Sequence, residues 1–486
     1  MSTRGSYMER RELRAWEMAR GIFDGSHPGV RPKEEQTWGM FIDAGAFHDQ
    51  SVFLDWGSNV PGSGAPESLM VAAVQSMENR GYRVSDEGYR YLNEGLQAYR
   101  DKDPIRLQTV SALLRSELAD AEKDPESDYW KYNYYGSFDD YLSSVKFPDP
   151  YPVDITDQSY RERVHAGWLS QLIGGAMGTM VEGYPSKRLY EAFGDVRGFL
   201  TEPNTYNDDV TFEIAFLEAF KEKGFGVSPK DIGLQWVGLI PGGWSAEEIA
   251  IRNIRNGILP PESGTYRNPF CEWIGAQMRG TICGMVAPGD PRKAAELAWK
   301  DASVSHANNG ILGEIFVSVM TSLSFVETDI GTIVRKAIDL IPKDSEYRSV
   351  VEYAWERCHE YEDWRDALSD CEGKYREYNW IHAYPNACCL VIAASYGKGD
   401  FAETLHIVTM CGLDADCNAG VLMPLIGISK GIDSIPERYR HPAFERLDTY
   451  MRGEFSKIPL DKLVDMTVEA TIRAQHKRNR WPGQWV

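Results

Sequence analysis

After about residue 160, apolar residues recur at spacings of three and four along one segment after another. In DDVTFEIAFLEAF the apolar positions i, i+4, i+7 and i+8 are Phe212, Phe216, Ala219 and Phe220. Residues at these spacings share one face of an α-helix, so each such segment predicts a helix with one buried face. Since no convincing run of alternating strand residues interrupts the series, we predict an all-α fold, a compact multi-helix domain.

The first 150 residues are predicted to be largely helical as well. SDEGYRYLNEGLQAYR and DPIRLQTVSALLRSELADAEK have the same apolar spacing, and each begins with Ser or Asp, which cap helices well. TWGMFIDAGAFHDQSVFLDWGSNVPGSG is different, because it is rich in glycine and aromatic residues and follows neither period. We predict that this early segment is irregular.

A proline-rich segment divides the chain. The three prolines of FPDPYP cannot continue a helix and favour extended backbone, which predicts a boundary between residues 145 and 160. With 486 residues the chain also exceeds the roughly 250 to 300 residues at which one core stops growing. We predict a helical N-terminal extension, 1–155, and a second helical domain, 156–486. Whether the extension is an interaction module or packs on the domain is left open.

Composition and charge exclude several classes of protein. The content of 43% hydrophobic and 12% aromatic residues indicates a globular chain. A net charge of −20 repels phosphate backbones and anionic lipids, so we expect neither nucleic acid nor a membrane as a partner. All eight cysteines lie in the second half without a CxxC pair, and the charged N-terminus contains no signal-peptide core. We expect a reduced, soluble protein of the cytoplasm.

Two acidic motifs stand at predicted helix starts. Asn207-Asp208-Asp209 precedes one helix; a single residue of this kind is an ordinary cap, but two adjacent acids exceed what a cap requires. Asp414 and Asp416 stand in the turn before another helix, where alternate side chains point toward one ion. Adjacent like charges become favourable when a divalent cation lies between them, and carboxylates suit Mg²⁺, Mn²⁺ or Ca²⁺.

A third motif is GGAMGTMVEG, an apolar helix that ends in the single carboxylate of Glu182. We interpret Gly174 and Gly178 as sites of close helix packing. A lone glutamate at the end of a buried helix is unfavourable unless it is paired, solvated or used in chemistry. Glu182 is therefore a candidate functional residue.

Together the three motifs resemble the ADP-ribosylglycohydrolase family. GGAMGTMVE is similar to its N-terminal motif, Asn207-Asp208-Asp209 to its Thr-Asp-Asp triplet, and Asp414-Ala415-Asp416-Cys417 to its Asp-x-Asp-Thr. Their order and separation match, and connecting stretches such as YPNACCLVIAASYGKGDF also resemble bacterial members. The resemblance covers about residues 160 to 460, and it implies a hydrolase with an ADP-ribosylglycohydrolase-like fold.

The resemblance implies two divalent cations, Mg²⁺ or Mn²⁺, held between the acidic motifs. The implied ligands are Asn207, Asp208, Asp209, Asp414, Asp416 and Cys417. Asn207 and Cys417 stand where the family usually has Thr, and Gly175 stands where it usually has Asp. An amide carbonyl still suits a hard cation, whereas a thiol matches Mg²⁺ poorly and Mn²⁺ or Zn²⁺ better.

By the same resemblance, Glu182 and Asp209 are expected to be catalytic, with Glu182 as general acid or base. We expect His306, Asn418 and Arg267 to bind the substrate. The alternative for His306 is a purely structural role. For Arg267 the alternatives are binding of a phosphate, together with the amides near Gly264, and capping of the core.

The expected reaction is metal-dependent hydrolysis of the bond between a ribosyl-type furanose, ADP-ribose or a related compound, and its acceptor. The partner is then a small ribosyl or ADP-ribosyl substrate, free or attached to a protein. One alternative is a hydrolase of a nucleoside or of another, non-nucleotide pentofuranoside. The other is an inactive protein that binds ADP-ribose or a nucleotide, which the departures at Asn207, Cys417 and Gly175 favour.

Overall fold

The computed structural model describes residues 13–480, with side chains as far as residue 476, and the chain divides into two compact units, Met1–Ser51 and Val52–Val486. The described part of the first unit holds helix α1 (Ala15–Asp24), a short 3₁₀ helix (Lys33–Glu35) and the greater part of α2 (Gly39–Trp56). Its large apolar side chains, such as Trp16 and Trp38, are mostly exposed.

Helix α2 corrects the prediction of an irregular segment. Its 18 residues, which end at Trp56, include two glycines but no proline. A glycine inside a helix costs only about 1 kcal/mol, whereas a proline would break the hydrogen-bond ladder. Val52 and Trp56, at its C-terminal end, are buried in the second unit, so tertiary packing supports a helix that the weak periodicity did not indicate.

The second unit begins with a small layer of helices and short hairpins. Its elements are α3 (Leu69–Asn79), α4 (Asp86–Asp101), α5 (Pro104–Ala119), α6 (Phe138–Ser144), and the antiparallel pairs β1 (Ser58–Asn59) with β2 (Pro66–Glu67) and β3 (Tyr82–Arg83) with β4 (Glu122–Lys123). The proline-rich segment that follows is not helical, as predicted, and the Tyr151 N–H donates to the Gly289 carbonyl at 2.8 Å.

The rest of the unit is a helical body. Its first half contains α7 (Gln158–Gly178), α8 (Ser186–Phe193), α9 (Asp208–Lys223), α10 (Pro229–Leu239), α11 (Ser245–Arg255), α12 (Glu262–Thr265), α13 (Thr281–Met285), α14 (Pro291–Ala302) and α15 (Asn309–Leu323). Its second half contains α16 (Ile330–Asp339), α17 (Glu346–Glu360), α18 (Trp364–Lys374), α19 (Ala383–Gly397), α20 (Phe401–Cys411), α21 (Ala415–Lys430), β5 (Arg446–Asp448), β6 (Lys457–Pro459) and α22 (Leu460–Arg480). The predicted all-α fold class is confirmed.

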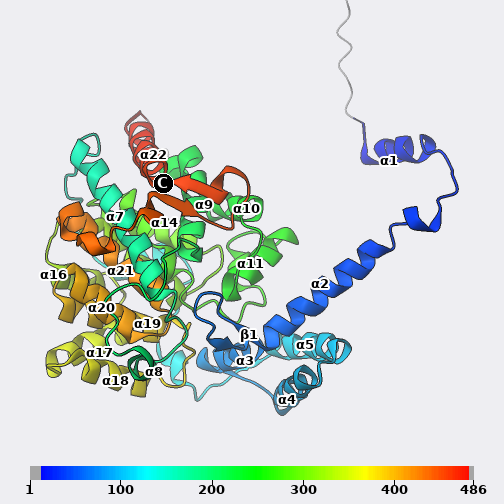
Figure 1. The fold of residues 1–486 in the computed structure, drawn as a ribbon, viewed down its shortest axis with the longest axis horizontal. Helices are drawn as coiled ribbons and strands as arrows, with labels where there is room; N and C mark the ends of the chain where they lie inside the picture. The colour runs from blue at the N-terminus through cyan, green and yellow to red at the C-terminus, as the bar shows by residue number, and fades with distance from the viewer. Residues whose placement is uncertain (1–12, 481–486) are drawn as a thin grey trace, which may run out of the picture. The chain divides into compact units, whose positions relative to one another are not determined.

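Helices α7 and α21 pack along each other inside this body (Figure 1). A Cβ on Gly174 would lie 2.4 Å from the Ala419 carbonyl oxygen, and one on Gly178 would lie 2.2 Å from the Asp416 backbone nitrogen. Only glycine allows the two backbones to approach this closely. The interpretation of both glycines as sites of close packing is confirmed, and this approach places the end of α7 beside the start of α21.

Buried hydrogen bonds attach residues 52–155 to the helical body. The Tyr129 hydroxyl donates to Glu272 Oε1 at 2.6 Å, and the Tyr141 hydroxyl donates to the Leu340 carbonyl at 2.9 Å. These residues therefore belong to the same compact unit as the rest. A domain boundary at residue 155 stays a prediction.

The predicted buried face of α9 is present. Phe212, Phe216, Ala219 and Phe220 are all at most 1% exposed. Their packing fixes the orientation of the helix and therefore the position of its acidic first turn. None of the helices formed by the described residues is long and apolar enough to cross a membrane.

Candidate active site

Two acidic residues open helix α9, directly after the residue that caps it. Asn207 Oδ1 accepts a hydrogen bond from the Val210 N–H at 3.3 Å, which satisfies one free amide of the first turn. Asp208 is half-buried and Asp209 is fully buried. Within the described residues, Asp209 Oδ2 has no hydrogen-bond partner. The cap uses neither aspartate, so the burial of this pair calls for another ligand.

The first turn of α21 holds the second acidic pair. Asp414 occupies the cap position, but its side chain makes no capping hydrogen bond, and Asp416 follows two residues later. Both are buried, and Oδ1 of each has no partner in the part of the chain that the structure describes. The Asp414 N–H donates to Asn386 Oδ1 on α19 at 3.2 Å, which fixes the start of α21.

The fold brings these two pairs together around Cys417. One potential ligand atom from each of Asp208, Asp209 and Cys417 lies within 4.8 Å of the others. The same limit holds for Asp414, Asp416 and Cys417. Cys417 Sγ donates to Asp209 Oδ1 at 3.1 Å, so the thiol contacts one pair and lies close to the other. Acidic residues about two hundred positions apart therefore form one cluster, which we call the acidic cluster.

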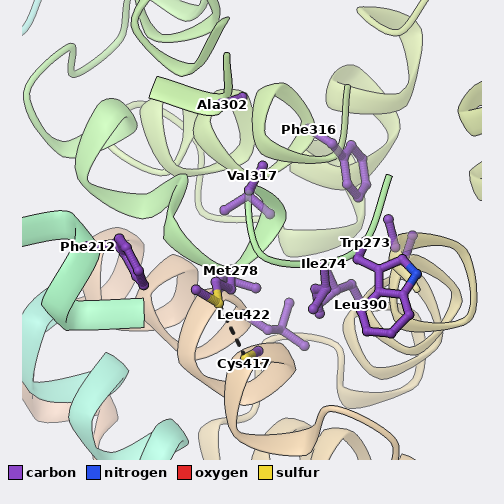
Figure 2. Close-up of a cluster of buried hydrophobic side chains, with 14 of the residues drawn as sticks. Phe212, Trp273, Ile274, Met278, Ala302, Phe316, Val317, Leu390, Cys417 and Leu422 are labelled. Carbon is purple, nitrogen blue, oxygen red and sulfur yellow. Dashed lines mark hydrogen bonds between the residues drawn. The ribbon is translucent and has the colours of Figure 1, made fainter. Parts of the chain in front are cut away.

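The other side of Cys417 faces apolar residues. Its Sγ lies 3.8 Å from Met278 Sδ, in a buried group that includes Phe212 and Leu422 (Figure 2). Burial, and then the charge of Asp209, raises the pKa of the Cys417 thiol well above its usual range. The thiol is therefore protonated in this environment, and it would become a thiolate ligand only with a bound cation.

The acidic cluster is electrostatically unfavourable without a positive charge. Burial raises the pKa of Asp209 and Asp414 well above the usual range and that of Asp416 to about 7. The next cause in each case is a neighbouring carboxylate: Asp208 for Asp209 and Asp416, and Asp416 for Asp414. A divalent cation would remove this repulsion and ligate the unpartnered oxygens. The residues present therefore fit a metal ion.

Glu182 lies in the turn after α7, next to this cluster. Burial, followed by the charges of Asp416 and Asp414, raises the pKa of Glu182 well above its usual range. The turn is paired with the loop before α21, because the Gly183 N–H donates to the Leu413 carbonyl at 2.7 Å and the Leu413 N–H donates to the Tyr184 carbonyl at 3.0 Å. The structure thus places Glu182 where its proton affinity depends on the acidic cluster.

His306 belongs to a different buried network. Its Nδ1 lies 2.7 Å from Ser305 Oγ and 3.7 Å from Glu247 Oε1. The same glutamate accepts from Arg279 Nη1 at 2.7 Å, and Arg279 Nε donates to Asp301 Oδ2 at 2.5 Å. Burial, followed by the charge of Arg279, lowers the pKa of His306 well below its usual range, so the ring is neutral. Its Nε2 has no hydrogen-bond partner among residues 13–480.

The two other residues predicted to bind the substrate differ in their exposure to solvent. Asn418 is fully buried beside Cys417 and donates through Nδ2 to Asn386 Oδ1 at 2.7 Å. Asn386 Oδ1 therefore accepts from both Asn418 and the Asp414 backbone. Arg267 is exposed, with its guanidinium 5.7 Å from the centre of the Tyr266 ring.

Comparison with known proteins identifies the family. The sequence model described as ADP-ribosylglycohydrolase matches residues 156–473, which is more than half of the chain. The chain belongs to the ADP-ribosylglycohydrolase family. It is a hydrolase that acts on glycosidic bonds. No curated protein matches this chain. Among solved structures, a chain described as "ADP-ribosylglycohydrolase-related protein complex" is 18% identical, with a TM-score of 0.45, over 65% of this chain and 99% of that one.

Two departures from the ADP-ribosylglycohydrolase motifs lie against each other. A Cβ on Gly175 would lie 3.2 Å from Asn207 Nδ2, and this nitrogen donates to Asp416 Oδ2 at 3.4 Å. An aspartate at position 175 would therefore meet the Asn207 amide. The Asn207 side chain thus links the start of α9, through the Val210 N–H, to Asp416 on α21.

Two residues near this ADP-ribosylglycohydrolase site were missed by sequence reasoning. Asn386 lies in the quoted segment YPNACC, but nothing in the segment showed that its side chain would hold the start of α21. Tyr450 follows β5 outside every motif. The residue is exposed, but desolvation of its phenol and then the charge of Asp208 raise the phenol's pKa well above the usual range. Both depend on contacts distant in sequence, which local patterns do not indicate.

Proposed function

We propose that this chain is a metal-dependent glycoside hydrolase that cleaves the bond between a ribosyl-type furanose, ADP-ribose or a related compound, and its acceptor. The observation that carries the proposal is the meeting of Asp209, Asp414 and Asp416 beside Glu182. Each of the three aspartates has a buried oxygen without a hydrogen-bond partner in the described part of the chain. Members of the family generally use divalent metal ions. The substrate and the metal are our inferences.

The residues that would hold two cations, Mg²⁺ or Mn²⁺, are Asp208, Asp209, Asp414, Asp416 and Cys417, with Asn207 through its Oδ1. When bound, the cations would hold the vicinal hydroxyls of the sugar and lower the pKa of the attacking water. The Asn207 oxygen already accepts from the Val210 N–H, so it is the least available of these ligands.

Glu182 has the properties of a general acid. Burial, the largest cause of its raised pKa, favours the neutral carboxyl, which has a proton to give when the bond between C1′ and the acceptor breaks. Water then adds to C1′, and its proton returns to Glu182, which restores the starting state. We assign Asp209 a second catalytic role, because its unpartnered Oδ2 is an acceptor for the attacking water.

The three substrate-binding residues keep separate roles in the proposal. Arg267 is exposed and cationic, which suits a phosphate of the substrate. Asn418 Oδ1 and His306 Nε2 are buried atoms with no hydrogen-bond partner in the described chain. Each is available for a hydrogen bond with a substrate group, although both side chains are enclosed in their own networks.

The test is turnover by the purified full-length protein. ADP-ribosylated peptides, ADP-ribose and simple pentofuranosides are incubated with Mg²⁺, Mn²⁺ or EDTA, and released sugar is measured by mass spectrometry. We expect release from an ADP-ribosylated substrate that EDTA abolishes and that Asp416→Asn lowers by at least about 100-fold. Cleavage of only a pentofuranoside would move the protein to that substrate class. Turnover that survives both EDTA and Asp416→Asn rules out the metal mechanism.

An inactive ADP-ribose-binding protein is the second candidate. The departures from the expected motif at Gly175, Asn207 and Cys417 favour it, because these residues surround the four acids. A titration of ADP-ribose decides between the two. Tight binding with metal present and no cleavage of any substrate would support the binding protein.

A further inference from the structure

A short hairpin from outside the family match lies in the second unit. The hairpin, residues 58–67, is formed by the pair β1–β2 and closed by hydrogen bonds from the Val60 N–H to the Ala65 carbonyl at 2.9 Å and from the Gly64 N–H to the Val60 carbonyl at 2.8 Å. The family match begins only at residue 156. Any part of the hairpin in the active site would therefore be an addition to the family's own elements.

The tip of the hairpin packs on the turn that carries Glu182. A Cβ on Gly62 would lie 2.2 Å from Thr179 Cγ2 and 2.8 Å from the Thr179 carbonyl oxygen. On the other side of Glu182, a Cβ on Gly183 would lie 2.5 Å from Ala65 Cβ. The hairpin thus contacts the turn at Thr179, three residues before the glutamate, and at Gly183, directly after it, at distances that leave no space for a further atom.

This turn has its own connection to the acidic cluster. The paired hydrogen bonds between Gly183, Tyr184 and Leu413 join it to the loop that precedes Asp414. The Tyr184 hydroxyl also donates to the Ser63 carbonyl at 3.4 Å, so residue 184 contacts both the hairpin and the loop. The hairpin therefore contacts the turn, the turn is hydrogen-bonded to the loop before Asp414, and this loop leads into the acidic cluster.

The base of the hairpin contacts a second element of the site. Trp244 Nε1, just before α11, donates to Glu67 Oε2 at 2.8 Å. Helix α11 carries Glu247, which pairs with Arg279, and the Arg279 guanidinium lies 5.7 Å from the ring of Phe212 on α9. The base of the hairpin therefore contacts the start of the helix whose Glu247 pairs with Arg279, and Arg279 lies against Phe212 of α9.

We propose that the hairpin 58–67 is a positioning element of the active site, which holds the turn at residues 179–184, and with it Glu182, against the loop before Asp414. This inference rests on the proposed function for its catalytic consequence. It gives part of the N-terminal region, outside the family match, a role in the reaction.

Gly62→Ala tests the proposal, because the added methyl group would push the hairpin away from Thr179. We expect kcat to fall about 10- to 100-fold, as for a small misplacement of a catalytic group, with KM changed less than about twofold. In the double variant Gly62→Ala/Thr179→Ser the nearest clashing atom, Cγ2, is absent, so part of kcat should return. Gly198→Ala is the matched control, since a Cβ there meets nothing within 4 Å.

A second measurement does not depend on turnover. Amide hydrogen exchange at Gly183 and Leu413 reports the pairing of the turn with the loop, and we expect Gly62→Ala to accelerate it about tenfold while Gly198→Ala leaves it unchanged. Ala65→Gly, which removes a contact without a clash, serves if Gly62→Ala does not fold. Failure of wild-type turnover would reject the proposed function alone. Wild-type exchange in Gly62→Ala and Ala65→Gly would overturn the positioning role, as would an unchanged kcat.

Discussion

At the scale of single residues, Cys417 distinguishes this site. Its sulfur lies within 4.8 Å of ligand atoms from both acidic pairs, whereas each aspartate belongs to one pair only. A thiolate is a soft ligand that binds Mn²⁺ or Zn²⁺ better than Mg²⁺. The position of one side chain therefore bears on the metal preference of both candidate sites.

We predict that Cys417→Thr shifts metal preference toward Mg²⁺. Since losing even an outer-shell partner costs about 10- to 100-fold in metal affinity, replacement of a ligand should weaken Mn²⁺ binding relative to Mg²⁺ by at least about tenfold. Calorimetric titration with each metal measures this ratio. The Co²⁺-loaded protein should also lose a near-ultraviolet sulfur-to-cobalt absorption band in the variant.

Cys358→Ser is the control for this experiment, because Cys358 is a half-buried cysteine of α17 and is not among the candidate ligands. It should keep both the metal ratio and the cobalt band. An unchanged ratio in Cys417→Thr, together with no cobalt band in the wild type, would remove Cys417 from the ligand set.

At the scale of elements, the α7–α21 pair sets the geometry of the site. Gly178 ends α7 directly against the backbone of Ala415 and Asp416, the first turn of α21. Any side chain at position 178 must separate the helices or displace this turn. Helix packing and metal ligation are thus linked through one glycine.

We predict that Gly178→Ala destabilises the fold and weakens metal binding together. Overpacking of this kind costs about 1–3 kcal/mol in the free energy of unfolding, and displacement of Asp416 lowers metal affinity. Chemical denaturation and metal titration measure the two effects. Gly21→Ala is the control, since this helical glycine has open space and alanine there is neutral or slightly stabilising. Wild-type stability and affinity in Gly178→Ala would refute the link.

The elements also show what the sequence could predict. The sequence predicted the buried face of α9 and the close-packing glycines of α7. In both cases the spacing of residues along the helix indicates which side is buried. Helix α2 was predicted wrongly, since its apolar residues surround the helix and the burial of Val52 and Trp56 at its end supports it. The contacts of Thr179 and Gly183 with the hairpin were not predicted at all, because they join residues more than a hundred positions apart.

At the scale of the whole molecule, the family match and the compact unit have different limits. The match begins at residue 156, whereas the unit begins at Val52. Tyr129 and Tyr141 bury hydrogen bonds to the helical body, so residues 52–155 share its core. A proline-rich segment indicated a break in helical structure correctly, but such a segment does not show whether the two sides pack together.

The acidic cluster should make the free energy of unfolding of the whole protein depend on pH. The pKa of Asp416 is raised from 3.8 to about 7 in the folded, metal-free chain. Between these values the unfolded chain releases this proton and the folded chain retains it, so the contribution is present below about pH 4 and is lost as the pH rises to about 7. We predict that metal-free wild type loses stability relative to Asp416→Asn over this range.

Thermal unfolding of both proteins in EDTA, at intervals from about pH 4 to about pH 7, measures this difference. The melting temperature of Asp416→Asn should rise relative to wild type as the pH increases, because the variant has no proton to lose at that position. Added Mn²⁺ should make the melting temperature of wild type the higher of the two near pH 7. The cation stabilises wild type by binding its folded chain, and it binds the variant more weakly. Melting curves that stay parallel across the range, with no response to Mn²⁺ in either protein, would mean that the four aspartates of the acidic cluster neither repel one another nor bind a cation.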